Sequence, residues 1–229
     1  MLNKTNKLLI STIIIINAGM LNAQYAYIIN DKDGYTNIRK KPNAKSQIVG
    51  KAYKYEVFFS IDNFCENELF SSGNWIIVST NEGDGYIYEK NILELSKLPV
   101  IEGKGNFDLS SEINESIITG KNDSITLVIK IESCSTQFYN EETDNAEYAE
   151  NLYLLNEITE IEINDRGRRI ILPKEKVNTY CNVSFVDLYI GNNDDLYLHF
   201  GGGDGEPWGV WMSIVDGKIV YYTHDIIGC

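Results

Sequence analysis

Few side chains in this sequence are of the types that carry out covalent or acid–base chemistry. The histidines are His199 and His224, and neither lies in a Gly-x-Ser-x-Gly or His-Glu-x-x-His motif. The cysteines are four and widely spaced: Cys65, Cys134, Cys181 and Cys229. No Cys-x-x-Cys spacing occurs, so a structural zinc site is not expected. An even number of cysteines, in a chain with the export signal described below, favours disulfides, and three pairings are open.

The acidic residues raise the question of a calcium site. The segment from Asp31 to Gly34, DKDG, begins like a calcium-binding loop, which needs oxygen ligands at alternate positions and a carboxylate at the twelfth. Counted from Asp31, the fifth position is Tyr35 and the twelfth is Pro42, so the calcium interpretation fails and a turn before a strand remains. Four acids nearer the C-terminus are interpreted as surface-loop residues: Asp194, Asp195, Asp204 and Glu206. No metal and no cofactor is predicted.

The first 23 residues have the pattern of a signal peptide. Lys4 and Lys7 precede an apolar run from Leu8 to Ile16, and small and polar residues follow. The run is too short for a membrane-spanning helix, which needs roughly 18 or more apolar residues. We therefore expect cleavage near Ala23-Gln24 and an exported mature protein, periplasmic or extracellular, without a membrane span.

The net charge of the chain limits the classes of partner that it can bind. The net charge of −13 becomes −13 − 2 = −15 when Lys4 and Lys7 leave with the signal peptide. Such an acidic protein repels phosphate backbones, so nucleic acid is not an expected partner. Residues 24–98 hold 9 basic and 10 acidic residues, whereas residues 99–229 hold 9 and 23. This asymmetry predicts two units.

The sequence predicts that short β-strands position these residues. Runs rich in Tyr, Ile, Val and Phe, bounded by Gly, Asn and Asp, predict a mainly β fold. In the first half the predicted strands are Tyr25 to Ile29, Thr36 to Arg39, Gln47 to Ala52, Glu56 to Ile61, Trp75 to Ser79 and Gly85 to Tyr88. A hairpin turn is expected at Asn81 to Gly85. The Gly- and Ser-containing segment from Ser96 to Ser111 predicts the boundary between residues 24–97 and residues 98–229.

The second half predicts an acidic β-rich domain with a meander or sandwich arrangement. Its first strands are expected at Ser124 to Ile131, Ile158 to Ile163 and Arg169 to Leu172. Residues 183–224 then predict a four-stranded meander with turns at 191–195, 201–207 and 216–217. The Gly-Gly-Asp-Gly segment before Trp208 resembles segments of uncharacterised secreted bacterial proteins, which implies no activity.

A set of short motifs in the first half resembles a known domain. The segments are DGYTNIR (residues 33–39), Pro42-Asn43, SQIVG (46–50), NWIIV (74–78) and GYI (85–87). In this order they resemble a bacterial SH3-like (SH3b) domain over about residues 25–95. That family has an Asn-aliphatic-Arg strand, a Pro-containing loop, an aliphatic pair before Gly, a Trp strand and a closing Gly-Tyr-aliphatic strand. One departure is the long segment from Asp62 to Gly73, which contains Cys65.

The resemblance implies a small β-barrel of five to seven strands that binds cell-wall peptides or serves as a targeting and packing module. Five apolar residues are expected to fill the barrel: Ile38, Ile48, Val49, Ile76 and Val78. Six residues are candidate ligand contacts: Tyr27, Tyr35, Arg39, Tyr53, Tyr55 and Tyr88. Tyrosine faces offer a large contact area with a polar tip, and Arg39 is suited to meeting a ligand or to fixing a loop by hydrogen bonds.

The resemblance also bears on catalysis. Wall peptidases that accompany SH3b domains use a Cys that opens a helix together with a His, whereas Cys134 and Cys181 lie in strand-like or loop sequence. No catalytic residue is predicted. We expect an exported, non-catalytic binding protein of the bacterial envelope, with a cell-wall peptide or an envelope protein as ligand. The alternatives are a secreted hydrolase with its site in the C-terminal domain, and a protein–protein interaction or inhibitor protein.

Overall fold

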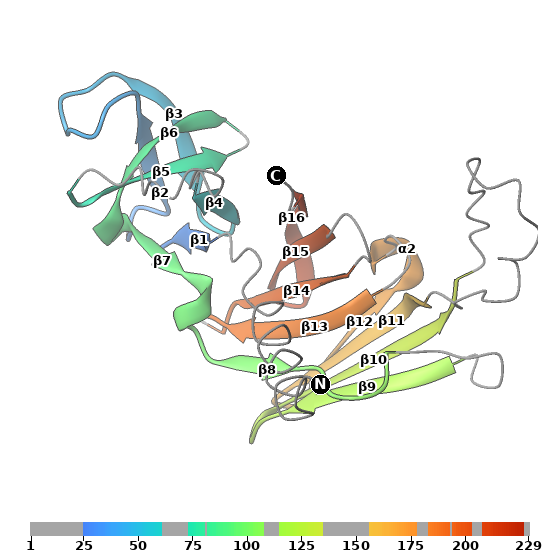
Figure 1. The fold of residues 1–229 in the computed structure, drawn as a ribbon. Helices are drawn as coiled ribbons and strands as arrows, with labels where there is room; N and C mark the ends of the chain where they lie inside the picture. The colour runs from blue at the N-terminus through green and yellow to red at the C-terminus, as the bar shows by residue number, and fades with distance from the viewer. Residues whose placement is uncertain are drawn as a thin grey trace, which may run out of the picture.

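The computed structural model describes eight segments of the chain: residues 25–60, 73–80, 82–107, 115–134, 156–177, 183–192, 194–202 and 208–226. The described residues are mainly β, as predicted, and form three antiparallel sheets (Figure 1). The predicted signal peptide and the cysteines Cys65, Cys181 and Cys229 lie outside the described residues. Cys134 is disulfide-bonded, and the three pairings left open by the sequence stay open.

The N-terminal unit, residues 25–98, contains a seven-stranded sheet. Its strands are β1 (Ala26–Ile29), β2 (Tyr35–Arg39), β3 (Ile48–Tyr53), β4 (Phe58–Ser60), β5 (Trp75–Thr80), β6 (Gly83–Tyr88) and β7 (Ile92–Glu94), with the 3-10 turns η1 (Glu89–Asn91) and η2 (Leu95–Lys97). The first six match the predicted strands, and β7 is an addition. The order β3-β2-β6-β5-β4-β1-β7 leaves β3 and β7 at the two edges, so the described strand pairs do not close the sheet into the expected barrel.

Alternation of apolar side chains builds the core of this unit, with one correction. Ile38 and Val78 are fully buried as predicted, and Ile76 packs against the same cluster. Ile48 and Val49 were expected in the core but are 48% and 42% exposed. The reason is a bulge: Ile38 pairs with Gly50 while Arg39 pairs with Ile48, which leaves Val49 as the extra residue on the edge strand β3.

The C-terminal unit contains the other two sheets. Its elements are β8 (Val100–Glu102), β9 (Glu115–Lys121), β10 (Ile125–Ser133), β11 (Asn156–Asp165), β12 (Arg168–Pro173), α2 (Lys174–Val177), β13 (Val183–Ile190), β14 (Leu196–Gly202), β15 (Trp208–Val215) and β16 (Lys218–Ile226). The sheet orders are β12-β11-β10-β9 and β16-β15-β14-β13-β8. The strands β13 to β16 lie next to one another in chain order within the five-stranded sheet. The strand β8 lies within the segment predicted as a linker and pairs with β13.

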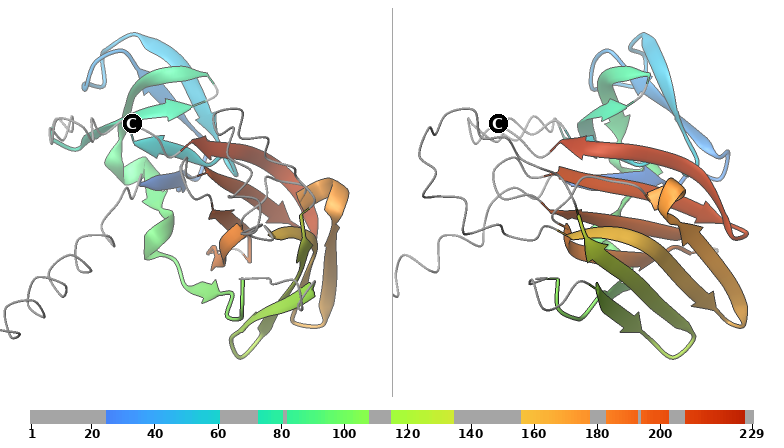
Figure 2. Two further views of the ribbon diagram at one scale, coloured as in Figure 1. Left: turned by 45° about the vertical axis from the view of Figure 1, so that its right-hand side comes forward. Right: turned by 90° about the vertical axis from the view of Figure 1, so that its right-hand side faces the viewer.

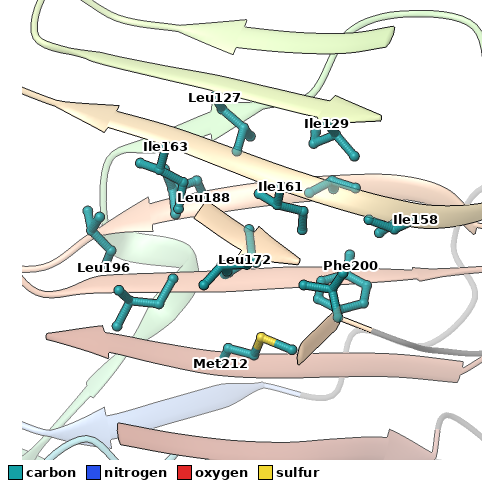
Figure 3. Close-up of a cluster of buried hydrophobic side chains, with 14 of the residues drawn as sticks. Leu127, Ile129, Ile158, Ile161, Ile163, Leu172, Leu188, Leu196, Phe200 and Met212 are labelled. Carbon is teal, nitrogen blue, oxygen red and sulfur yellow. The ribbon is translucent and has the colours of Figure 1, made fainter. Parts of the chain in front are cut away.

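The two C-terminal sheets enclose one apolar core (Figure 3). Residues at every second position of β10 are buried, from Ile125 to Ile131, while the residues between them face outward. Phe200 and Met212 fill the same core from the five-stranded sheet and are fully buried. Lys130 on the outer face pairs with Glu160, so this face is charged and solvated.

The other face of the five-stranded sheet packs against the N-terminal unit, which Figures 1 and 2 show on the opposite side from β9 to β12. A third apolar cluster joins Ile28, Val57 and Leu95 to Tyr197 and Trp211. Hydrogen bonds also cross this contact: the Ser213 hydroxyl donates to the Tyr55 carbonyl at 2.6 Å, and the Tyr221 hydroxyl donates to the Val57 carbonyl at 3.1 Å. The five-stranded sheet is therefore covered on both faces.

Candidate functional site

A pocket opens on the N-terminal unit where the loop after β2 meets β5, β6 and η1. Its volume is about 250 Å³. The lining residues are Thr36, Asn37, Arg39, Ala44, Trp75, Tyr88 and Asn91. Among the described residues, the lining combines two large aromatic rings, one cation, two amides and the Thr36 hydroxyl, and it includes no carboxylate. An apolar wall with a few convergent polar groups is the usual composition of a ligand site.

Trp75 and Tyr88 form the aromatic wall of the pocket. They lie opposite each other in the register of β5 and β6, and their ring centroids are 5.3 Å apart with the planes tilted by 56°. Cross-strand aromatic pairs of this kind stabilise a hairpin while leaving part of each ring exposed. Both side chains are half-buried. The strands therefore hold the rings in place before any ligand arrives, which lowers the entropic cost of binding.

The polar side of the pocket is also held by internal hydrogen bonds. The Asn91 amide donates to the Thr36 hydroxyl at 2.8 Å, which joins η1 to β2. The Arg39 guanidinium donates through Nη1 to the Ser46 carbonyl at 2.8 Å. This bond spans the loop that contributes Ala44 to the lining. Arg39 thus has the loop-fixing role expected from the sequence, and it also lines the pocket.

The loop between β2 and β3 is ordered by its own hydrogen bonds. The Lys41 amide donates to the Ser46 hydroxyl at 2.9 Å, and the Lys45 amide donates to the Asn43 side chain at 3.0 Å. The Lys40 amide donates to the Gln47 carbonyl at 2.9 Å. The loop therefore forms a defined wall of the pocket.

The charge around the pocket differs from that of the rest of the protein. Residues 34–55 contain six basic residues and no acid: Arg39, Lys40, Lys41, Lys45, Lys51 and Lys54. Lys40, Lys41 and Lys45 are exposed in the loop that walls the pocket. This basic segment, residues 34–55, is a local concentration of positive charge in a strongly acidic chain.

The structure separates the six predicted ligand contacts. Arg39 and Tyr88 line the pocket. Tyr35 and Tyr53 pack against each other at 6.5 Å on β2 and β3, away from the pocket lining. Tyr55 lies in the turn that contacts the five-stranded sheet, with its carbonyl bonded to Ser213.

The prediction for Tyr27 requires a correction. Tyr27 is only 8% exposed and stacks on Phe58 at 6.2 Å in the core, so it does not belong to a ligand groove. Trp75, Thr36 and Asn91 line the pocket but were not among the predicted ligand contacts. The sequence could have identified Trp75, because a Trp and a Tyr on two adjacent predicted strands can form an aromatic wall.

Gly85 couples the core of the N-terminal unit to the pocket. A Cβ atom there would lie 2.6 Å from Ile38 Cγ2 and 2.8 Å from the Arg39 carbonyl oxygen. Since the second neighbour is backbone, Gly85→Ala is expected to push β2 aside and lower the free energy of unfolding by about 1–3 kcal/mol. Urea unfolding measures this, with the exposed Ser79→Ala on β5 as the control. Equal stability of the two variants would contradict the close packing at Gly85.

A second group of polar residues lies in the C-terminal unit. Cross-strand pairing aligns Glu102, Asp187, His199 and Trp211 in one row of the five-stranded sheet. The His199 ring stacks on Trp211 at 3.8 Å and meets the edge of Phe185 at 4.8 Å. Burial lowers the pKa of His199 to about 3. An imidazole of such low basicity is a poor general base at neutral pH, so His199 is not a candidate for that role.

Asp187 in this row makes stability depend on pH. Burial, and then the charge of Glu102, raise the pKa of Asp187 from 3.8 to about 6. The folded state therefore binds a proton more tightly than the unfolded state, and the contribution of Asp187 to stability falls as pH rises from about 4 to about 6. Asp187→Asn removes this loss. After allowance for partial exposure, the variant is expected to gain about 1–2 kcal/mol over the wild type between pH 4 and pH 7.5.

Urea unfolding of both proteins at these two pH values measures the gain. The control is Asp33→Asn, because Asp33 lies exposed in the turn before β2. A difference between Asp187→Asn and wild type that stays constant from pH 4 to pH 7.5 would contradict the raised pKa of Asp187.

Further features bear on the class of the site. Within the described residues, no three His, Cys, Asp or Glu side chains gather in a way that would hold a metal ion. In the same part of the chain, no helix has the length and apolarity needed to cross a membrane. The fold is mainly β, and its N-terminal unit carries a pocket lined by aromatic residues and an arginine. Comparisons with protein-family models, curated proteins and solved structures found no match to this chain.

Proposed function

We infer that the protein is an exported binding protein of the bacterial envelope, and that the pocket lined by Arg39, Trp75 and Tyr88 receives a peptide of the cell wall. The N-terminal unit acts in this proposal as an SH3-like module, in line with the motif resemblance over residues 25–95. The C-terminal unit acts as an acidic, non-catalytic domain. The observation that carries the proposal is the pocket itself, with its preorganised aromatic wall and a basic segment beside it.

The chemistry of the pocket favours a peptide over other ligands. The faces of Trp75 and Tyr88 offer apolar contact for a side chain, while Asn37 and Asn91 carry amide groups that both donate and accept hydrogen bonds. Backbone amides of a peptide match such a mixed lining. The net charge of −13 opposes a nucleic acid as the ligand.

The test is sedimentation of the mature chain, residues 24–229, with insoluble peptidoglycan at physiological salt. Retention on intact peptidoglycan and none on chitin, an insoluble glycan without stem peptides, are the expected results. Equal retention on both materials would show binding to glycan and contradict a peptide ligand. Absence of retention on either would remove the wall as the ligand and leave an envelope protein as the partner to seek.

A further inference from the structure

Arg39 differs from the other arginines of this protein. The chain has four, and Arg166, Arg168 and Arg169 each form an ion pair with an aspartate or glutamate. Among the described residues, none of the ion pairs includes Arg39, although the chain has 33 acidic residues. Among the described residues, no carboxylate lines the pocket in which Arg39 lies. A half-buried guanidinium without a counter-charge would be stabilised by an anionic ligand, because burial of an unpaired charge costs free energy.

The geometry of Arg39 suits a carboxylate. A guanidinium has five N–H donors in a planar fork, and the hydrogen bond of Arg39 within the described residues uses Nη1, which donates to the Ser46 carbonyl at 2.8 Å. This bond fixes the plane of the fork while leaving donors for a ligand. Two parallel N–H···O bonds from arginine to a carboxylate are stronger and more specific than the contacts that lysine makes.

The surroundings of Arg39 favour the same partner. The loop that walls the pocket exposes Lys40, Lys41 and Lys45, and the whole basic segment, residues 34–55, contains no acid. Their summed field attracts an anion towards the pocket and weakens with added salt. The pocket volume of about 250 Å³ lies below the roughly 300–1,000 Å³ of typical small-molecule sites, so the pocket holds only a short part of a peptide.

We propose that the pocket recognises a peptide by its free terminal carboxylate, with Arg39 as the anchor and the Trp75–Tyr88 wall in contact with the adjacent side chain. This proposal rests on the proposed function and specifies the ligand class of the same site. It assigns Arg39 a role beyond fixing the loop. The loop lysines Lys40, Lys41 and Lys45 contribute long-range attraction and no direct specificity.

The test compares two forms of one probe. Soluble muropeptides released from peptidoglycan by a muramidase are used as they are, and a second portion is treated with a carbodiimide and ammonia so that carboxylates become neutral amides. Binding of each to the mature chain, residues 24–229, is measured by calorimetry. We expect affinity for the amidated portion to be lower by about tenfold to a hundredfold, the range for losing hydrogen bonds to a charged group.

Variants separate the anchor from general electrostatics. Arg39→Gln is expected to bind both portions equally and weakly, and Arg39→Lys to recover only part of the preference. The combined variant Lys40→Gln, Lys41→Gln, Lys45→Gln is expected to bind more weakly with a shallower salt dependence but to keep the preference. Lys32→Gln, an exposed lysine that does not line the pocket, is the control and is expected to behave as wild type.

The outcomes distinguish this proposal from the proposed function. Equal and measurable affinity of the wild type for both portions would overturn the carboxylate anchor while leaving peptide binding intact. Absence of binding to either portion would overturn both. Because the comparison of the two portions uses only the wild-type protein, a folding defect in Arg39→Gln does not affect it, and thermal melting of each variant identifies such a defect.

Discussion

Trp75→Ala is expected to reduce the affinity for peptidoglycan by about thirtyfold, the loss that removal of a central aromatic anchor produces in binding sites. Trp75 provides half of the aromatic wall, and its ring lies 5.3 Å from that of Tyr88. Alanine would leave the partner ring without support as well as removing contact area. A sedimentation isotherm, with bound protein measured against peptidoglycan concentration, gives the affinity of wild type and variant.

The control for this prediction is Tyr25→Ala. Tyr25 is 44% exposed on the same unit and does not line the pocket, so its removal is expected to leave binding unchanged. Trp75→Phe is expected to fall between alanine and wild type. If Trp75→Ala retained full affinity while keeping its wild-type melting temperature, the pocket would not be the binding site.

Trp211→Ala is expected to cause the largest loss of stability, about 3–5 kcal/mol in the free energy of unfolding. Trp211 is 4% exposed and belongs to the cluster that joins the N-terminal unit to the five-stranded sheet. It also stacks on His199 at 3.8 Å and packs against Tyr189 at 5.5 Å. Truncation would leave a cavity between the two units and expose the buried His199 ring.

Urea unfolding followed by circular dichroism measures this loss. The matched control is Val220→Ala on the neighbouring strand β16, because Val220 is 49% exposed. Its expected effect is within about 0.5 kcal/mol. A loss below about 1 kcal/mol for Trp211→Ala would contradict the contact between the units, since a fully exposed tryptophan contributes that little.

Strand positions were readily predicted from the sequence because turn residues separate short apolar runs. Gly34 and Gly217 adopt positive φ values of 74° and 78°, as a turn before β2 and a turn between β15 and β16 require. Three strands, β7, β8 and β9, were not predicted, and for β7 and β8 the reason is their length. The segments of β7 and β8 are three residues long, and their place in a sheet is decided by pairing with distant strands, β1 and β13.

The site was predicted only in part, because alternation along a strand does not say what covers each face. Tyr27 and Tyr88 look alike in sequence, yet Tyr27 stacks on Phe58 in the core and Tyr88 lines the pocket. Tyr55 lies in a turn whose carbonyl accepts a hydrogen bond from Ser213, 158 residues further along the chain. Nothing near Tyr55 in the sequence predicts that contact. A bulge at Val49 also turns Ile48 outward while Ala52 on the same strand stays buried, and residue types along the strand do not predict a bulge.

The central claim is that the pocket lined by Arg39, Trp75 and Tyr88 binds a cell-wall peptide. An NMR titration of the ¹⁵N-labelled mature chain with soluble muropeptides tests it most directly, since the indole N–H of Trp75 and the side-chain N–H of Arg39 report on the pocket atom by atom. The largest shift changes are expected at these two groups, with the indole of Trp211 unchanged. Shift changes confined to the five-stranded sheet, or none at saturating muropeptide, would contradict the claim.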